Sequence, residues 1–214
     1  MLSYPPVRHP QSASEERFNL LTHGLGLILS LLGAVFLMRE ASQQGALHMV
    51  ACAVYACSLV TLFGSSTFYH GCALGALKEK ARMLDHCAIL FLIAGSYTPL
   101  MALTLGGWKG WSVLGAVWLL DALGVLHKFT SRDPFGVASV VLCLLMGWLV
   151  MLVWRPLTAT LDPSALNWLV AGGIAYTAGV PFYAWGRLPY NHGVWHLFVL
   201  LGAACHYITV FKVL

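Results

Sequence analysis

Two histidines near the end of the sequence carry the clearest chemical signal. His192 and His196 are separated by three residues, and on an α-helix this spacing places both imidazoles on one face, one turn apart. Such a pair can supply two ligands to one metal ion, and His70 can supply a third nitrogen from a neighbouring helix. Three histidines with one open position are typical of catalytic rather than structural zinc. Neutral imidazoles also suit copper, iron or nickel, and zinc is the default in the absence of redox motifs.

Two further polar residues accompany these histidines. Asp85 offers a carboxylate that can accept a hydrogen bond, or a proton, from a water molecule activated by the metal. Ser66 lies four residues before His70 and therefore on the same helical face, where its hydroxyl can form a hydrogen bond near the site. Asp85 and Ser66 are thus the candidate catalytic residues beside the predicted metal.

The composition indicates the environment in which these residues work. Residues of the set AVILMFWYC make up 59% of the 214 residues, and charged residues make up 9%, whereas an ordinary soluble domain carries about 25% charge. The mean hydropathy is +0.76. So few charges cannot cover a water-facing surface, which excludes a soluble globular protein. Disorder requires low hydrophobicity with high charge, so a disordered chain is excluded as well. The net charge of +4 comes from scattered Lys and Arg residues, which argues against nucleic-acid binding. The composition therefore indicates an integral membrane protein.

Seven apolar segments follow one another, each about as long as the 20 residues that a membrane-spanning helix needs. They cover residues 19–38, 47–69, 84–105, 108–127, 135–154, 165–185 and 193–213. The segments are continuous, whereas the strands of a membrane barrel would alternate apolar and polar residues. We therefore expect an all-α fold, a seven-transmembrane helix bundle over residues 19–214 with an intramembrane metal site. A polar cytoplasmic segment, residues 1–18, is expected to precede it.

A seven-span arrangement brings the candidate residues to one end of the bundle. Consecutive spans run in opposite directions. The second span ends at His70, the third begins with Asp85, and the seventh begins with His192 and His196. Ionisable residues within spans are costly and are functional candidates by default. These residues are therefore expected at one depth on one side of the membrane.

The distribution of Lys and Arg predicts which side is cytoplasmic. Eight of these residues fall on the side of the N-terminus and four on the other side, and the more basic side stays inside. The eight are Arg8, Arg17, Lys78, Lys80, Arg82, Lys128, Arg132 and Arg187, and the four are Arg39, Lys109, Arg155 and Lys212. We expect a plasma (inner) membrane protein with a cytoplasmic N-terminus and an external C-terminus. The first residues lack the basic start and the cleavage site of a signal peptide, so the first span is expected in the mature protein.

Simpler interpretations are open for several of these residues. Histidines at the ends of spans can lie at the membrane interface, as is expected of His23, His48 and His127. Asp85 can be a helix N-terminal charge or cap. A single H-x3-H spacing also arises by chance, so the metal site depends on the convergence of all the candidate residues.

Four other polar residues have open roles. Cys72 and Cys87 flank the same region and are alternative soft ligands, although packing is the simpler role. Asp121 lies inside the fourth span, where it can line a cavity or reach water through a defect in the bilayer. His206, with Tyr207 beside it, is expected to be a hydrogen-bonded residue of helix packing rather than a ligand.

Four motifs spread over nearly the whole sequence carry a family resemblance. They are Glu15-x3-Asn19-x2-Thr22-His23-x2-Gly26, Ser65-Ser66-Thr67-Phe68-Tyr69-His70, Leu84-Asp85-His86 with Ala94-Gly95-Ser96-Tyr97-Thr98-Pro99, and His192-x3-His196 with His206-Tyr207. This combination resembles the bacterial hemolysin III proteins, the prokaryotic branch of the progestin and adiponectin receptor family. The likeness extends from about Glu15 to Tyr207.

The resemblance implies a seven-helix membrane fold with a zinc ion near the cytoplasmic face. It implies His70, His192 and His196 as zinc ligands, with Asp85 holding the zinc-bound water and Ser66 as a further partner. The wider superfamily includes alkaline ceramidases, which are zinc-dependent amide hydrolases of membrane lipids. Bacterial members are named for haemolysis and are linked to membrane homeostasis.

Three functions follow from these features. The leading hypothesis is a zinc-dependent hydrolase of lipid amides or esters, with a membrane lipid or free fatty acid in an intramembrane cavity. The alternative is a non-enzymatic sensor or regulator of membrane homeostasis with structural zinc. A cytolytic or pore-forming protein ranks lowest, because Asp121 and His206 are too sparse to form a polar stripe. The sequence does not indicate an oligomeric state.

Overall fold

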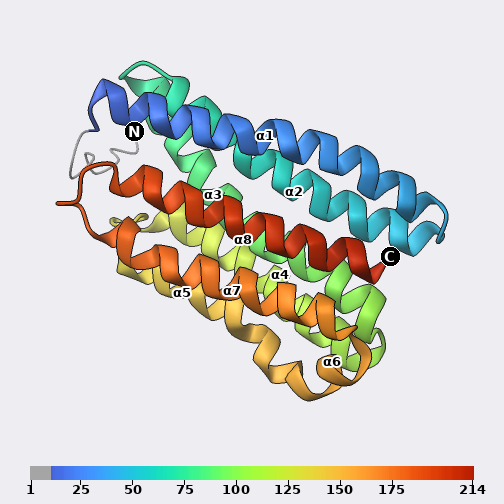
Figure 1. Ribbon diagram of the computed structural model, residues 1–214. Coiled ribbons are helices and arrows are strands. Elements are labelled where there is room, and N and C mark those ends of the chain that lie inside the picture. The colour runs from blue at the N-terminus through green and yellow to red at the C-terminus, as the bar shows by residue number, and fades with distance from the viewer. Residues whose placement is uncertain (1–10) are drawn as a thin grey trace.

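The computed structural model describes residues 11–214, which are helical apart from short connections and contain no strand. The helices are α1 (Ala13–Ser42), α2 (Ala46–Gly71), α3 (Ala76–Pro99), α4 (Gly107–Thr130), α5 (Val137–Trp148), α6 (Trp154–Thr160), α7 (Pro163–Ala184) and α8 (Asn191–Val213) (Figure 1). The predicted all-α fold is confirmed for these residues.

Within residues 11–214, six helical stretches are long and apolar enough to cross a membrane. They are Ala13–Ser42, Ala46–Gly71, Ala76–Leu105, Gly107–Thr130, Val137–Thr160 and Asn191–Val213. Each coincides with one predicted span, so the chain is a multi-pass membrane protein. α7, the counterpart of predicted span 165–185, has 22 residues and no charged side chain. It is not among the six stretches.

Helix α1 begins well before the apolar run that starts at Asn19. Ser12 caps the helix: its hydroxyl accepts a hydrogen bond from Glu15 N, and the Glu15 carboxylate accepts one from Ser12 N. This reciprocal pair satisfies backbone donors that a helix start leaves unpaired. The predicted border at residue 18 therefore falls inside α1, while residues 1–10 of the predicted polar segment lie outside the described residues.

The fifth apolar segment is not one continuous α-helix. A 3₁₀ segment, Leu149–Val153, joins α5 to α6. At its start the Tyr97 hydroxyl accepts a hydrogen bond from Val150 N, 2.8 Å away, and lies 2.9 Å from the carbonyl oxygens of Met146 and Gly147. A break in a membrane helix needs such partners, because the bilayer offers no water to the freed backbone groups.

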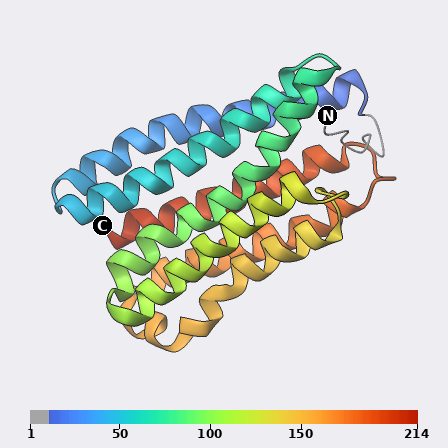
Figure 2. The same cartoon turned by 180° about the vertical axis from the view of Figure 1, so that it is seen from behind.

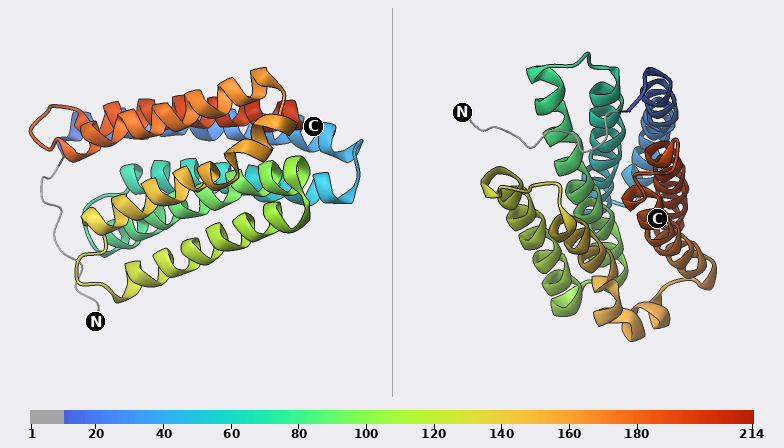
Figure 3. Two further views of the ribbon diagram at one scale, coloured as in Figure 1. Left: turned by 90° about the horizontal axis from the view of Figure 1, so that it is seen from below. Right: turned by 90° about the vertical axis from the view of Figure 1, so that its left-hand side faces the viewer.

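The most extensive packing joins neighbours in sequence, with further contacts of α3 to α5 and of α8 to α1 and α3. α1 packs along α2, α2 along α3, and α7 along α8, while α8 also contacts α1. Figures 2 and 3 show α3 and α4 on the side of the bundle away from α7 and α8. Buried side chains form one cluster around Leu90, Val117 and Met146 and a second around Tyr55 and Val199. The second cluster holds α8 against α1 and α2.

One end of the bundle gathers the helix termini that matter for the site. α1, α3 and α8 begin there and α2 ends there, whereas α8 ends at the opposite end (Figure 1). His70 lies in the last turn of α2, and His192 lies in the first turn of α8. The antiparallel packing of these helices therefore places residues that are far apart in sequence at one end.

Candidate metal centre

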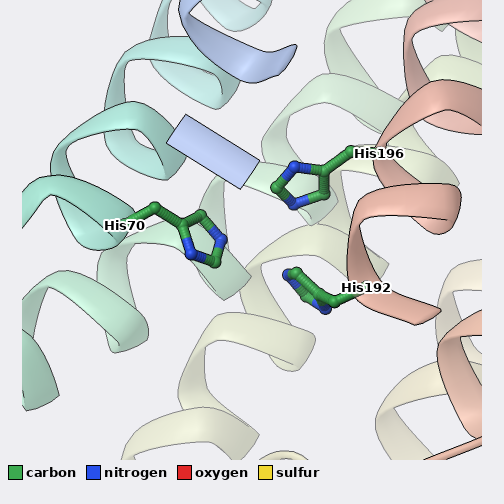
Figure 4. Close-up of side chains that lie close together, drawn as sticks. All are labelled: His70, His192 and His196. Atoms are coloured by element: carbon green, nitrogen blue, oxygen red, sulfur yellow. The ribbon is translucent and has the colours of Figure 1, made fainter. Parts of the chain in front are cut away.

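Three histidine side chains from two helices face one another at this end (Figure 4). The potential ligand atoms of His70 on α2 and of His192 and His196 on α8 all lie within 4.8 Å of one another. The ring centroids are 5.2 Å apart for His70 and His192, 5.0 Å for His70 and His196, and 4.6 Å for His192 and His196. The structure thus brings together the three predicted ligands in a group that could hold a metal ion.

The connection between α7 and α8 sets the position of two of these histidines. Tyr190, the residue before α8, has a left-handed φ of 56°. Asn191 begins α8, and its side-chain amide donates hydrogen bonds to the carbonyl oxygens of Phe182 (3.2 Å) and Tyr183 (3.4 Å) at the end of α7. The start of α8 is therefore fixed one residue before His192, and its first two turns present both histidines to the interior.

The unpaired nitrogens of the cluster fit a cation. His70 Nε2 and His192 Nε2 are buried and have no hydrogen-bond partner among the described residues. A buried polar atom without a partner costs free energy, and a lone pair that binds a metal ion removes this cost. Nitrogen ligands of this kind suit first-row transition metals such as zinc. The residues present therefore fit a metal ion, and their role as its ligands stays a prediction.

The two predicted catalytic residues lie beside the cluster. Asp85 on α3 and Ser66 on α2 are buried, at 6% and 0% exposure, and line one cavity with His192 and His196. The Asp85 carboxylate does not belong to the converging ligand group, and its catalytic role stays a prediction. α3 begins at Ala76, and Asp85 lies in its third turn. The interpretation of Asp85 as a helix cap is therefore wrong.

The other polar residues lie apart from the cluster. Neither Cys72 nor Cys87 belongs to a metal-ligating group among the described residues, and both are partly buried free thiols. His206 packs against Gly172, where a side chain would collide with the imidazole, and this agrees with the predicted packing role. Asp121 on α4 is not among the residues that line the cavity.

Three side chains of α1 contact the cluster, although the sequence analysis placed none of them at the metal site. Glu16 Oε2 lies 2.7 Å from His70 Nδ1, and Thr22 Oγ1 lies 3.2 Å from His196 Nδ1. His23 is 3% exposed and stacks on His196 with centroids 3.4 Å apart, so its interpretation as an interface residue is wrong. A sequence signal existed, because Glu16 and His23 are seven residues apart and share a helical face.

A cavity of about 370 Å³ opens from the cluster into the bundle. Its walls are mainly apolar and include Leu62, Ile89, Leu100, Leu144, Leu169 and Val199. The lining residues of α8 extend from His192 to Val210, which corresponds to roughly 27 Å along a helix axis. Lys128 is also in the wall, and its ammonium donates hydrogen bonds to Pro134 O (2.9 Å) and Ser139 Oγ. The cavity is therefore long and mainly apolar, with His192, His196 and Asp85 at one end and a few further polar residues, among them His206 and Thr209, along its length.

Comparison with known proteins shows similarity along nearly the whole chain. A family model described as Haemolysin-III related matches residues 11–207. Hemolysin-3 of Bacillus cereus is 39% identical over 205 residues, which cover 95% of this chain and 94% of the relative. The Hemolysin-3 homolog of Bacillus subtilis (strain 168) is 37% identical over 197 residues, 92% of each chain. The human Monocyte to macrophage differentiation factor is 29% identical over 215 residues, 97% of this chain and 87% of the relative. These matches confirm the resemblance, and the chain belongs to the haemolysin-III-related family of membrane proteins.

Proposed function

We propose that this chain binds zinc and hydrolyses an amide or ester bond of a membrane lipid. One observation carries the proposal: a group of three histidines and a buried carboxylate lie together at one end of a long apolar cavity in a membrane protein. A lipid hydrolase needs a place for the acyl chain, a means to polarise its carbonyl group and a proton acceptor. The cavity, the metal group and Asp85 match these needs in that order.

Zinc is the metal that this ligand set suits best. Structural zinc sites have four protein ligands, whereas catalytic sites have three and keep one position open. Only His70, His192 and His196 form the converging group among the described residues. Bound there, zinc supplies Lewis acidity, which polarises a carbonyl group and acidifies water at neutral pH.

Asp85 moves the proton in this proposal. Water adds to the carbonyl carbon, and its proton passes to the Asp85 carboxylate. The C–N or C–O bond then breaks, and the proton passes from Asp85 to the leaving amine or alcohol. The products are a fatty acid and an amine or alcohol, so the reaction balances without another reactant. Ser66 lies against this carboxylate from the neighbouring helix and orients it.

The acyl chain of a membrane lipid, or of a free fatty acid product, occupies the apolar cavity. Ligand sites for such molecules are concave and mainly apolar, with a few polar groups that fix orientation. Here the histidines and Asp85 lie at one end, and the walls beyond them are mainly apolar, with a few polar residues such as His206 and Thr209. The carbonyl group of the lipid is therefore held at the metal end, with its hydrocarbon chain pointing along α8.

α7 completes a bundle of seven spans in this proposal. Two observations support it. α1 begins and α8 ends at opposite ends of the bundle, which requires an odd number of crossings (Figure 1). α7 also packs along α8, which is itself among the apolar spans. With the bias of Lys and Arg in the loops, the metal site faces the cytoplasm and the C-terminus is external.

Release of fatty acid from defined lipids tests the hydrolase. The purified, zinc-loaded protein is incubated with long-chain N-acyl and O-acyl lipids, and the released fatty acid is measured by mass spectrometry. Ether analogues with the same chain but no carbonyl group are the matched substrate control. We expect release from an acyl lipid, none from its ether analogue, and loss of release in His192→Ala. No release from any acyl lipid, while an active ceramidase cleaves the same preparation, contradicts the hydrolase.

The packing of α2 and α8 favours a second candidate function. His70 is on α2 and the other two histidines are on α8, and these helices share side chains of the second buried cluster while their backbones approach closely at few places. A metal ion between them would act as a clamp that fixes the end of α2 against the start of α8. A sensor or regulator of membrane homeostasis could use such a clamp without any chemistry at Asp85.

A further inference from the structure

Helix α1 supplies none of the three converging histidines, yet its N-terminal half lies against them. Glu16 and Thr22 are within hydrogen-bond distance of two of the imidazoles, and His23 stacks on one of them. Proteins commonly orient a metal-binding histidine through a hydrogen bond from its second ring nitrogen. The donor and the acceptor in each of these hydrogen bonds therefore determine which ring nitrogen of His70 and of His196 carries the hydrogen.

Glu16 fixes the protonation pattern of His70. Glu16 Oε2 lies 2.7 Å from His70 Nδ1, and Oε1 lies 3.0 Å from the ammonium of Lys78. The ammonium is held in turn by the carbonyl oxygens of Tyr69 (3.2 Å) and Cys72 (3.3 Å) at the end of α2. A carboxylate paired with an ammonium only accepts hydrogen bonds, so His70 Nδ1 carries the hydrogen. Neutral His70 then has its lone pair on Nε2, the buried atom without a partner.

Thr22 has the same effect on His196. Its Oγ1 lies 3.2 Å from His196 Nδ1, and 2.9 Å and 3.0 Å from the backbone oxygens of Asn19 and Phe18. A hydroxyl group has one hydrogen, and the carbonyl groups one turn back on α1 take it. Oγ1 therefore accepts a hydrogen bond from His196 Nδ1, which leaves the lone pair on Nε2. His23 stacks at 3.4 Å with its ring tilted by only 11°, and this restricts rotation of the His196 ring.

We infer that α1 is the positioning helix of the metal centre, in which Glu16 and Thr22 hold His70 and His196 in the form that presents Nε2 to the ion. The inference rests on the proposed metal site and adds residues that do not touch the ion. It accounts for a carboxylate and a histidine on the inner face of an otherwise apolar span, where such groups are costly. It also joins α2 and α8, which carry the ligands, through a third helix.

Zinc affinity of the purified full-length chain tests this inference. Glu16→Gln removes the charge but keeps the shape, and its amide can offer a hydrogen to Nδ1, so it no longer enforces one form of His70. Thr22→Val replaces the hydroxyl by a methyl group. Loss of such an outer partner lowers metal affinity by about 10–100-fold, and we expect this decrease in each variant. Affinity is measured by competition with a chromophoric chelator, and the absorption spectrum of bound Co²⁺ reports the ligand geometry.

Two residues give matched controls. Glu40 lies in the last turn of α1, at the opposite end of the helix from Glu16, and the Thr67 hydroxyl donates a hydrogen bond to Phe63 O. The hydrogen bond of Thr67 does not involve the histidine cluster. Glu40→Gln and Thr67→Val are therefore expected to keep the zinc affinity and the Co²⁺ spectrum of the wild type.

Each outcome bears on the inference. Wild-type zinc affinity in both Glu16→Gln and Thr22→Val overturns it. If circular dichroism shows that the Glu16→Gln variant has lost helical structure, the zinc affinity of Thr22→Val alone tests the inference, because this substitution only replaces a hydroxyl by a methyl group. A wild-type chain that binds no metal overturns both this inference and the proposed zinc site. Tight zinc binding that depends on Glu16 and Thr22, without hydrolysis of any lipid, overturns only the proposed reaction.

Discussion

Asp85 separates the two proposed functions, because only a hydrolase needs its carboxylate. Asparagine has nearly the same shape but cannot accept the proton, and loss of a positioned general base costs about 10²–10⁴-fold in rate. We expect Asp85→Asn to lower fatty acid release by this factor. Zinc content is expected to stay unchanged, because Asp85 does not belong to the converging ligand group. Release and zinc content are measured on the same preparation.

Asp121→Asn is the matched control, since Asp121 is also an acidic residue within a span but does not line the cavity. It is expected to keep full activity. A metal clamp predicts instead that Asp85→Asn keeps the cellular function of the wild type. Full lipid hydrolysis by Asp85→Asn would show that another group moves the proton.

The candidate ligands could be predicted from the sequence to different degrees. The i, i+4 spacing of His192 and His196 is a local property of a helix, so it was visible in the sequence. His70 could be grouped with them because consecutive spans run in opposite directions, which places the end of the second span and the start of the seventh at the same end of the bundle. Glu16 and Thr22 could not be assigned, because they meet their histidines across 54 and 174 residues. Such contacts depend on how α1 is rotated in the bundle: the seven-residue spacing of Glu16 and His23 places both on one helical face but does not show which helix that face meets.

At the scale of the elements, one tyrosine stabilises the break between α5 and α6. The Tyr97 hydroxyl bonds to Val150 N and to the carbonyl oxygens of Met146 and Gly147. Leaving a buried group without its partner costs about 1–3 kcal/mol. We expect Tyr97→Phe to lower the free energy of unfolding by this amount without changing the zinc content. Unfolding is followed by circular dichroism in detergent with added denaturant.

Tyr55→Phe is the control for this substitution. The Tyr55 hydroxyl is buried and has no hydrogen-bond partner among the described residues, so its removal is expected to leave stability unchanged or slightly increased. Equal destabilisation by both substitutions would mean that packing, and not the hydrogen bonds of Tyr97, holds the segment.

The elements themselves were largely predictable because continuous apolar runs of span length leave few alternatives to membrane helices. The break in the fifth segment was not predictable. Residues 135–154 are apolar almost throughout, and the group that satisfies the freed backbone comes from α3. The early start of α1 was missed for a different reason, since its cap at Ser12 lies in a polar stretch before the apolar run.

For the whole molecule, the number of spans fixes the relation between the two ends of the chain. Seven crossings put the C-terminus on the side opposite the N-terminus, and six put both on the same side. A reporter active only outside the cytoplasm can be fused after Leu161, after Gly186 and after Leu214. We expect activity at the first and third positions and none at the second, because α7 returns the chain to the cytoplasm.

The fusion after Gly186 is the direct test of α7. A cytoplasmic reporter fused at the same positions is the matched control and is expected to give the inverse pattern. External activity after both Leu161 and Gly186 would show that α7 does not cross the membrane, and would reverse the predicted side of the C-terminus.

Composition alone identified the membrane class. The sequence also predicts a span at residues 165–185, whose counterpart α7 is not among the six apolar stretches of the described residues.

The account depends most on the claim that His70, His192 and His196 hold one metal ion. Elemental analysis of the purified chain by plasma mass spectrometry measures this directly, with His192→Ala as the test variant and His48→Ala, at the other end of α2, as the matched control. We predict about one zinc per chain in the wild type and in His48→Ala, and a large loss in His192→Ala. A wild type without stoichiometric transition metal, or equal metal in all three proteins, would contradict the account.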